Sequence, residues 1–302
     1  MALVREPPKT ILVTGAAGFI GRRLCALLVD QYSVRCLVRD ISRAKTLLPP
    51  ATEIVLGDMT DAASLGTAAK GCAAIVHLAA LKSDERDIVA VNVGGARNLV
   101  AACKAAGVRR VINVGSQAGR MIRRGAYGDT KAQSDEIFNA SGLEVTTLLP
   151  SVVYGPQDRG AFGKLVSVTA ASPIVPVIGD GRTAYRPIHI DDVCAVIEGC
   201  LRTPKTIGKT YSVGGAETVT LEGFIDFIAA RLGRKPLKVH IPVWAALMSA
   251  RVLALIFDLP PLTRSNVLGA IYSAPDADYA SIFAELGLKP RSFADGMKDS
   301  LP

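Results

Sequence analysis

Short apolar runs alternate with longer amphipathic stretches along the first half of the chain. The apolar runs, rich in β-branched residues, occupy residues 11–14, 34–38, 53–56, 74–77, 110–114 and 145–149. Such runs are typical of parallel strands covered on both faces. Helical periodicity lies between them, notably over residues 18–31 and 91–106, with Gly107 at an expected C-cap. The pattern predicts an α/β fold with a doubly wound parallel sheet of the Rossmann type.

The rhythm loosens after residue 150, where prolines break the chain into shorter elements. We therefore expect a flexible N-terminus over residues 1–9 and a nucleotide-binding domain over residues 10–150, to which some later segments return. Residues 151–302 are expected to form mostly a smaller α/β lobe that binds substrate. Within this lobe, Thr220 should begin a helix that ends at Gly233.

A second apolar segment of the lobe, residues 243–257, contains Arg251 and is too short to span a bilayer. We expect this segment to cover the substrate pocket or the core. Two other interpretations stay open, namely contact with a membrane surface and contact with a second subunit.

Composition excludes several classes of protein. With 49% hydrophobic and 21% charged residues, the chain is too apolar for a disordered protein. The net charge of +8 favours anionic partners, but the basic residues are scattered and aromatic content is low, so we expect no nucleic-acid partner. The six cysteines lie far apart without CxxC pairs. They indicate reduced, buried thiols of a cytoplasmic protein and no metal site. The N-terminus MALVREPPKT has no apolar signal core, and no stretch reaches the roughly 18 apolar residues that a spanning helix needs, so we expect no membrane span.

The loop after the first strand has the sequence TGAAGFIG and leads directly into a helix. Gly15 permits a tight turn, Gly18 lets the backbone approach a diphosphate, and Gly21 allows the helix to pack closely on the sheet. Open amide groups at the start of the helix would then face the diphosphate. The loop predicts a site for a nicotinamide dinucleotide, with Ala17, Phe19 and Ile20 also lining it.

The residues after the second strand bear on the choice of dinucleotide. Arg39 stands where a guanidinium can hold the 2′-phosphate of NADP, with Arg43 or Lys45 assisting. Asp40 would instead be needed for the ribose hydroxyl of NAD, and Arg39 could also be a solvated charge at a strand end. We favour NADP(H) over NAD(H).

Two later strand ends add candidates for cofactor binding. Asp58 and Met59 follow the third strand, where the carboxylate could accept a hydrogen bond from the adenine amino group or could cap a helix. The fourth strand ends in His77, which we expect to be a packed residue. The small residues after it leave room for the cofactor, and they are Leu78, Ala79 and Ala80.

The segment YGDTK sets a phenol and an ammonium group four residues apart, at Tyr127 and Lys131. On a helix this spacing places both on one face, and a nearby ammonium stabilises phenolate. Ser116 follows the fifth strand at the carboxyl edge of the sheet, where its hydroxyl could hold a substrate oxygen. The three residues form a candidate catalytic set for proton transfer.

Together these features resemble the short-chain dehydrogenase/reductase superfamily, in particular its extended or atypical branch of epimerases, dehydratases and dihydroflavonol-reductase-like enzymes. Further matches span about residues 10–200. The C-terminal part is also similar to bacterial relatives of the dehydrogenase-like accessory subunit of respiratory complex I. The matching segments are TGAAGFIG at 14–21, VRCLVRD at 34–40, HLAA at 77–80, the run 92–116, PSVVYGP at 150–156 and RPIHIDDV at 186–193.

The resemblance implies a role for each matching residue. Tyr127 would be the general acid/base, Lys131 would bind the nicotinamide ribose and lower the pKa of the phenol, and Ser116 would orient the reacting oxygen. Pro150 and Val153 would border the nicotinamide. Arg186 would contact substrate, while His189, Asp191 and Asp192 are expected to form a structural corner.

The chain departs from the family pattern at two points. The interval between Ser116 and Tyr127 is short, so Gln117 could compete for the role of the serine in holding substrate. Leu149 stands where nucleotide-sugar epimerases commonly carry arginine, which weakens the case for such a substrate. We expect a small-molecule substrate that is an apolar carbonyl compound, steroid-like or isoprenoid-like, and the family also suggests a homodimer.

Three functions are compatible with these observations. The first is an NADP(H)-dependent oxidoreductase that moves hydride between the cofactor and a carbonyl or alcohol. The second is a non-catalytic NADP(H)-binding protein that stabilises or regulates an assembly. The third is an epimerase or dehydratase that retains its cofactor. The fold does not distinguish them, and the set Ser116, Tyr127 and Lys131 favours an enzyme.

Overall fold

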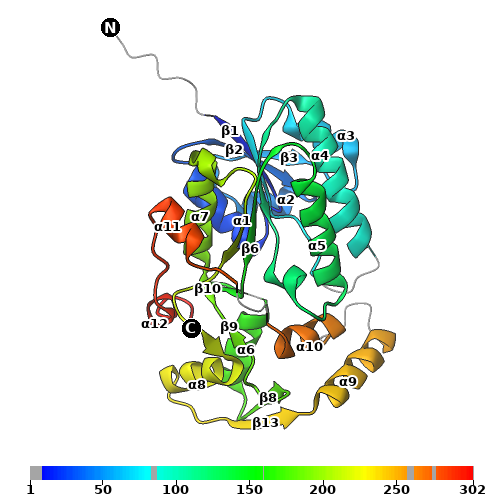
Figure 1. The fold of residues 1–302 in the computed structure, drawn as a ribbon. Helices are drawn as coiled ribbons and strands as arrows, with labels where there is room; N and C mark the ends of the chain where they lie inside the picture. Colours follow the sequence, from blue (N-terminus) through cyan, green and yellow to red (C-terminus); the bar gives the residue numbers. More distant parts are fainter. Residues whose placement is uncertain (1–8, 83–86, 159, 257–261, 274–276, 302) are drawn as a thin grey trace.

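A seven-stranded parallel sheet forms the centre of the larger part of the molecule (Figure 1). The computed structural model describes residues 9–82, 87–158, 160–256, 262–273 and 277–301. The strands lie in the order β11-β6-β5-β4-β1-β2-β3, so the direction of winding reverses between β1 and β4. Their bounds are β1 Thr10–Thr14, β2 Ser33–Val38, β3 Glu53–Leu56, β4 Ala74–His77, β5 Arg110–Val114, β6 Glu144–Pro150 and β11 Thr210–Val213.

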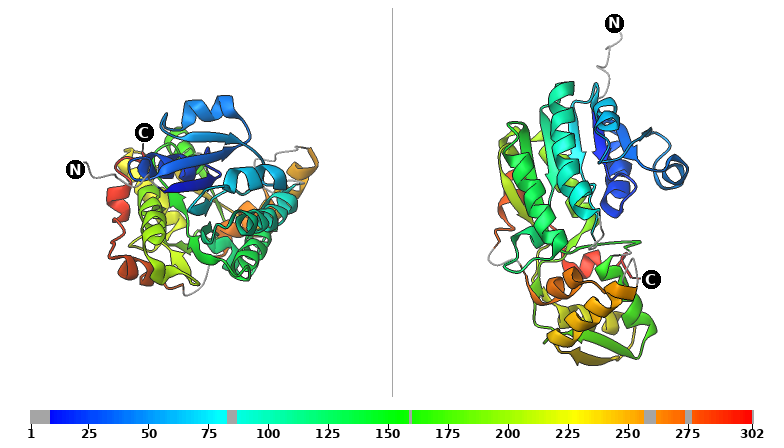
Figure 2. Two further views of the ribbon diagram at one scale, coloured as in Figure 1. Left: turned by 90° about the horizontal axis from the view of Figure 1, so that it is seen from above. Right: turned by 90° about the vertical axis from the view of Figure 1, so that its right-hand side faces the viewer.

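Helices cover both faces of this sheet (Figure 2). Because successive strand side chains point to opposite faces, Ile11 and Val13 enter one core cluster while Leu12 enters the other. The first cluster includes residues of α1 Phe19–Leu28, α2 Ile41–Leu47, α7 Ile190–Arg202 and α11 Ser281–Leu286. The second includes residues of α3 Ala62–Ala69, α4 Gly95–Ala106 and α5 Ala126–Asn139.

The smaller part of the molecule is built on three two-stranded sheets. The pairs are β7 Val153–Tyr154 with β10 Ile188–His189, β8 Ile174–Ile178 with β13 Leu237–Ile241, and β9 Ala184–Tyr185 with β12 Val219–Thr220. The helices here are α6 Ala161–Ala171, α8 Leu221–Arg231, α9 Val243–Ile256, α10 Arg264–Ile271 and α12 Phe293–Gly296. Rings of Tyr154, Phe162, Phe224 and Phe293 pack edge to face or tilted in its core.

Three short helical turns complete the path of the chain. A π-turn, η1 Ala90–Gly94, runs directly into α4, whose C-cap Gly107 has a left-handed φ of +73° as expected. A 3-10 turn, η2 Gln117–Arg120, follows β5, and another, η3 Pro204–Thr206, precedes β11.

The Rossmann-type α/β fold expected from the hydrophobic pattern is confirmed, and its first six strands lie where the apolar runs are. The pattern did not identify β11, which pairs in parallel with β6 at the edge of the sheet. The chain therefore returns to the large sheet after residue 150. The division into two domains stays a prediction.

The described part of residues 243–257 forms α9, and one face of it packs into a small core cluster, as expected for a segment that covers the core. Its other face differs from that expectation, because Trp244 is 71% exposed and Leu255 84% exposed. The buried side of α9 is made by Ala246 and Ala250, because small side chains let the helix approach Val267 of α10 closely. No described helix has the length and apolar character needed to cross a bilayer.

The six cysteines are buried and form no disulfides, as their spacing indicated.

Thr220 provides a test of the helix signals in the smaller part of the molecule. Its hydroxyl caps α8 by accepting a hydrogen bond of 3.0 Å from the Gly223 amide. Thr220→Ala should lower the free energy of unfolding by about 1 kcal/mol, measured by urea denaturation, because that amide loses its partner. Thr220→Ser retains the oxygen and should behave as wild type. Equal stability of the alanine and serine variants would contradict the capping role.

Candidate active site

The glycine turn after β1 has no room for a side chain at Gly15 or Gly21. Gly15 has a φ of +71°, and a Cβ atom there would lie 2.7 Å from the amide nitrogen of Ala79. A Cβ atom on Gly21 would meet the backbone of Ala16 at 2.7 Å, so the start of α1 lies close against the turn. The turn therefore brings β1, α1 and the segment after β4 into direct contact.

The start of α1 fits an anion. Gly18 is the N-cap residue, and no side chain caps the helix there. The first turn of α1, which includes Phe19 and Ile20, contains no acidic residue that would repel a diphosphate. Ala17 lies half-buried beside Gly18. Open amides at a helix start, reached across a glycine backbone, suit the diphosphate of a dinucleotide.

At the end of β2, Arg39 forms no ion pair with a described residue, whereas the carboxylate of Asp40 is hydrogen-bonded to the start of α2. Asp40 is the N-cap of α2, and its carboxylate accepts a hydrogen bond of 2.9 Å from the Arg43 amide. The side chains of Arg39 and Arg43 are exposed, and neither forms an ion pair with a described residue. Two guanidinium groups are therefore free to meet an anionic group beside β2.

Asp58 does not cap a helix. Its carboxylate accepts hydrogen bonds from the amide and the hydroxyl of Thr60, at 2.8 and 2.6 Å, while Asp61 caps α3. These bonds with Thr60 lower the pKa of Asp58, burial opposes them, and the nearby Arg39 lowers it further. Asp58 is thus an ionised acceptor next to the arginine at the end of β2. Met59 is buried and packs against Gly95 at the start of α4.

The segment after β4 lies against the glycine turn. The Ala79 amide donates to Thr14 Oγ1 at 3.4 Å, and Leu78, Ala79 and Ala80 are half-buried. Thr14 Oγ1 also lies 2.8 Å from Nδ1 of His77, which is buried. Burial, followed by the charge of Lys131, lowers the pKa of His77 to about 3. This imidazole is therefore neutral and packed, as expected.

The three candidate catalytic residues meet at the carboxyl end of β5. Ser116 follows β5 and caps η2, while Tyr127 and Lys131 lie one helical turn apart on α5. A side-chain hydrogen bond joins Ser116 to the Tyr127 phenol. Lys131 is only 2% exposed and donates from Nζ to the carbonyl oxygen of Val114 at 2.8 Å. The sequence signals thus converge on one place in the fold.

Burial is the largest cause of the pKa shifts of Tyr127 and Lys131. It raises the pKa of Tyr127, the hydrogen bond with Ser116 opposes the rise, and the charge of Asp135 adds to it. Burial also lowers the pKa of Lys131, and Asp135 opposes that change. At neutral pH the phenol holds its proton, so Tyr127 is arranged to donate one.

Asp135 is a functional candidate that the sequence analysis missed. It lies one turn beyond Lys131 on α5, is 6% exposed, and accepts a hydrogen bond of 2.8 Å from Asn113 Nδ2. A Cβ atom on Gly115 would lie 2.6 Å from its Oδ1, so the carboxylate packs directly on the turn that carries Ser116. Burial raises the pKa of Asp135, and Lys131 opposes the rise. The four-residue spacing that relates Tyr127 to Lys131 continues to Asp135 and could have revealed it.

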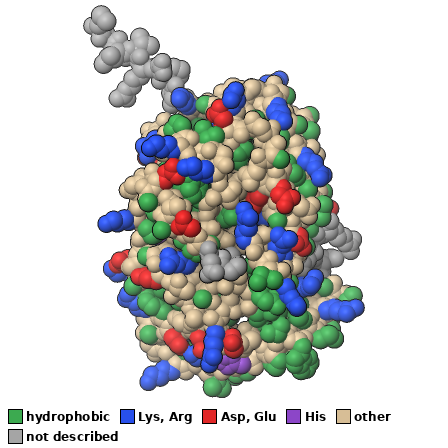
Figure 3. Space-filling model, in the orientation of Figure 1, with side chains coloured by type: hydrophobic (Ala, Val, Ile, Leu, Met, Phe, Trp, Pro, Cys, Tyr) green, Lys and Arg blue, Asp and Glu red, His purple; other side chains and the backbone are tan. Residues whose placement is uncertain are grey.

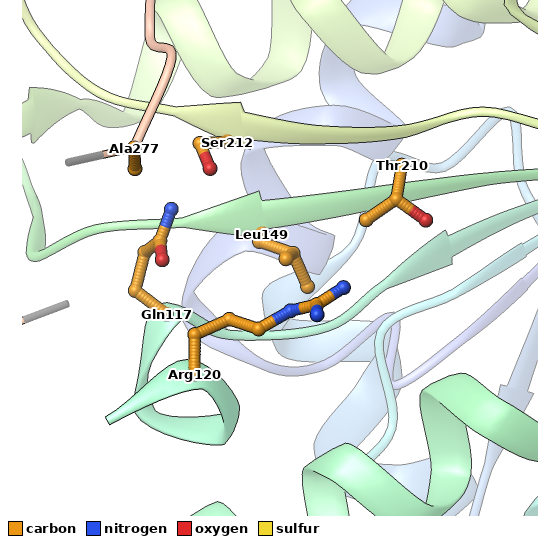
Figure 4. A pocket seen from close by; sticks show the side chains of 6 residues that line it. All are labelled: Gln117, Arg120, Leu149, Thr210, Ser212 and Ala277. Carbon is orange, nitrogen blue, oxygen red and sulfur yellow. The ribbon is translucent and has the colours of Figure 1, made fainter. Parts of the chain in front are cut away.

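A cavity of about 260 Å³ lies against η2, the turn that Ser116 caps (Figure 4). Gln117 is 7% exposed, and neither polar atom of its amide has a hydrogen-bond partner among the residues that the structure describes. The amide and the guanidinium of Arg120 both reach into the cavity. The phenol pairs with Ser116, whereas Gln117 offers a donor and an acceptor to a polar group in the cavity. The lining residues are Gln117, Arg120, Leu149, Thr210, Ser212 and Ala277.

The mouth of the site lies where β6 and β11 end. Pro150 ends β6, and Val153 begins β7, where it pairs with Ile188. The guanidinium carbon of Arg186 lies 5.5 Å from the ring centre of Tyr279. Burial raises the pKa of Tyr279, and Arg186 opposes the rise. Tyr279 stands in a segment without clear periodicity, which is why the sequence did not reveal it.

Contacts at the start of α7 account for the residues expected to form a structural corner. His189 caps α7 by accepting the Asp191 amide at 3.2 Å. Asp191 binds Nη2 of Arg23 at 3.0 Å, and Asp192 binds Nε of Arg291 at 3.0 Å. These bonds hold α7 to α1 and to the C-terminal segment. In the described part of the chain, no group of three His, Cys, Asp or Glu residues could hold a metal ion.

Comparison with known proteins identifies relatives across most of the chain. A profile of the NAD dependent epimerase/dehydratase family matches residues 11–214. The chain is 32% identical over 236 residues to ceramide reductase from Caulobacter vibrioides, covering 77% of this chain and 73% of the relative. It is 26% identical over 287 residues to 2-alkyl-3-oxoalkanoate reductase from Shewanella oneidensis, covering 82% and 72%.

Solved structures share the fold over nearly the whole chain. A double mutant of DesIV, a dTDP-glucose 4,6-dehydratase from Streptomyces venezuelae with NAD bound, is 26% identical with a TM-score of 0.77, covering 96% of this chain and 95% of that one. UDP-glucuronic acid 4-epimerase from Bacillus cereus, in complex with UDP-glucuronic acid and NAD, is 21% identical with a TM-score of 0.77, covering 96% and 97%. The latter likeness concerns the fold alone.

Proposed function

The chain belongs to the NAD-dependent epimerase/dehydratase family of short-chain dehydrogenase/reductase enzymes, and we propose that it is an NADP(H)-dependent reductase of an apolar carbonyl compound. The observation that carries the proposal is the meeting of Ser116, Tyr127 and buried Lys131 beside the glycine turn. A non-catalytic cofactor-binding protein would have no need for a protonated phenol held in this way.

Arg39 and Arg43 support NADP(H) as the cofactor. Both guanidinium groups are open at the end of β2, where they would bind a 2′-phosphate through charge-assisted hydrogen bonds. Asp40, the residue that would bind a free ribose hydroxyl, is engaged with the start of α2. Asp58 would accept a hydrogen bond from the adenine amino group, and the backbone near Met59 and Ala79 would line the adenosine.

Proton transfer by this chain would pass through the Tyr127 hydroxyl. The cofactor supplies a hydride equivalent at its nicotinamide ring when bound. Ser116 would hold the carbonyl oxygen of the substrate, and Tyr127 would donate its phenolic proton to that oxygen. Lys131 would bind the nicotinamide ribose from its buried position, and its charge would stabilise the phenolate left after transfer. Pro150 and Val153 would border the ring.

The two reductases among the relatives support an apolar substrate, since their names describe ceramide and alkyl oxoalkanoate substrates. Leu149, where nucleotide-sugar epimerases commonly carry arginine, lines the cavity beside the site and offers no charge to a sugar nucleotide. Gln117 and Arg186 would bind the polar end of the substrate. The unpartnered amide of Gln117 is the feature that favours a polar group at that position.

Tyr127→Phe tests proton transfer. The variant should lose about 10²- to 10⁴-fold in kcat for NADPH-dependent reduction, because it lacks the donated proton. The dissociation constant for NADPH should change little. Turnover would be measured on a panel of long-chain ketones, with Tyr32→Phe as a control at the opposite end of the sheet. Activity that survives in Tyr127→Phe would refute the role, and tight NADPH binding without turnover in the wild type would favour an assembly function.

Arg39→Ala tests the choice of cofactor. Loss of a charge-assisted contact with the 2′-phosphate should weaken NADPH binding by about tenfold or more while leaving NADH binding nearly unchanged. Dissociation constants for both would be measured by calorimetry. Arg109→Ala is the matched control, since Arg109 pairs with Glu144 at the far edge of the sheet. Equal weakening of NADPH and NADH would exclude a role in phosphate recognition.

Asp135→Asn tests the charge beneath the catalytic pair. Without this carboxylate the pKa values of both Lys131 and Tyr127 should fall, because Asp135 raises each of them. The ammonium and the phenol would then lose their protons at lower pH, so the alkaline limb of the pH profile of kcat/KM should move to lower pH. Asp135→Glu retains the charge and should leave the limb in place. An unshifted limb in Asp135→Asn would leave Asp135 with a packing role only.

A further inference from the structure

Helix α9 turns its large apolar residues to solvent. They recur at intervals of three or four residues and so form one stripe, which we call the α9 stripe. A helix packed in a core has the reverse arrangement, with large residues inside, whereas the inner face of α9 consists largely of alanines. The stripe consists of Trp244, 71% exposed, Met248, 54%, Val252, 49%, Leu255, 84%, and Ile256, 65%.

The stripe belongs to a wider apolar surface. Figure 3 shows hydrophobic side chains gathered over the part of the molecule where α9 and α10 lie. The strand β13, which leads into α9, adds Leu237 at 63% and Val239 at 42% exposure. Large apolar side chains exposed in this number mark a place of contact with something else.

Glu222 and Asp226 of α8 face Lys238 and His240 of β13, and the charged residues nearby that form no ion pair with a described residue are basic. From residue 227 to residue 257 the chain contains no Asp or Glu, and five residues are basic. Lys238 pairs with Asp226, but Arg234, Lys235 and Arg251 form no ion pair with a described residue. Arg251 stands on α9 itself and is exposed. The contacting surface is therefore expected to be anionic.

We propose that the α9 stripe docks on the surface of an anionic lipid bilayer. A helix with an apolar face, a tryptophan and flanking basic residues can lie in the interface with its apolar face among the acyl chains and its arginines at the headgroups. A second copy of the chain fits this surface less well. In a two-fold contact Arg251 would meet the same basic segment of its partner, which has no carboxylate to pair with it.

The surface adjoins the mouth of the candidate active site through α10. Helix α10 packs on α9, and the Tyr185 hydroxyl donates to the Gly269 carbonyl of α10 at 2.8 Å. A Cβ atom on Gly125, two residues before Tyr127, would lie 3.1 Å from Cα of Ser265 in the same helix. Docking through α9 would thus place α10 between the bilayer and Tyr127. A lipid-soluble substrate could then pass from the bilayer to the site along α10. This consequence rests on the proposed function.

The chain carries its own reporter of docking, because Trp244 is its one tryptophan. Vesicles of phosphatidylcholine with phosphatidylglycerol should shift its emission to the blue, and brominated acyl chains should quench it. Vesicles of phosphatidylcholine alone should bind more weakly, and added salt should weaken binding to the anionic vesicles. Flotation of the full chain with the same vesicles gives a second measurement.

Val252→Glu combined with Leu255→Glu should weaken vesicle binding by about tenfold or more, since each change places a charge where an apolar group would be buried. Val168→Glu is the control, because Val168 is 37% exposed on α6, outside the α9 stripe and outside the residues proposed to bind the cofactor. NADPH binding and reduction of a water-soluble ketone should be the same in the wild type, the double variant and the control variant. These two measurements test the proposed enzyme function independently of vesicle binding.

Two results would overturn the proposal. One is the absence of both emission shift and flotation with anionic vesicles in the wild type. The other is a dimer, measured by sedimentation, that forms in solution, is broken by the double variant and hides Trp244 from vesicles; the stripe would then be a subunit interface.

Discussion

The close approach of two backbones at Gly15 is the constraint on which the candidate site depends. The amide of Ala79 lies where any side chain at Gly15 would have to be, so β1 and the segment after β4 can converge only across a glycine. These two strands flank the point where the winding of the sheet reverses. The open start of α1 and the carboxyl end of β5 consequently share one edge of the sheet. The open amides of α1 and the phenol of Tyr127 therefore lie at the same edge of the sheet, as the proposed dinucleotide site requires.

Burial of charge governs the chemistry at that edge. Lys131 is almost completely buried. Its ammonium donates one short hydrogen bond to the carbonyl oxygen of Val114, and the negative charge of Asp135 raises its pKa. A buried ammonium without a nearby carboxylate would tend to lose its proton. The same carboxylate raises the pKa of Tyr127, so a single buried acid favours the protonated form of both catalytic groups. Asp135 also packs on Gly115, so the carboxylate that raises both pKa values is in contact with the turn that carries Ser116.

The strands and helix ends that could be predicted from the sequence are those determined by residues close together in the chain. The six apolar runs became strands because a parallel sheet buried on both faces needs continuous apolar segments, and Thr220 and Gly107 mark helix ends through their own backbone and side-chain chemistry. Strand β11 escaped notice, since its sequence TYSV is short and half polar and pairs with a strand sixty residues earlier. Tyr279 is likewise defined only by its contact with Arg186. Such long-range contacts leave no periodic trace.

Helix α9 shows where an apolar pattern stops being informative. Its composition is that of a core helix, and the pattern alone favours burial of the leucines and the tryptophan. The fold instead buries Ala246 and Ala250, because α10 approaches closely at Val267 and leaves room only for small side chains. Trp244, Met248 and Leu255 are then left exposed on the outer face of a helix whose one charged residue is Arg251. Exposing this much apolar surface to water costs free energy. The exposed apolar residues lie beside basic residues that have no ion pair with a described residue, and this combination supports contact of α9 with an anionic lipid surface.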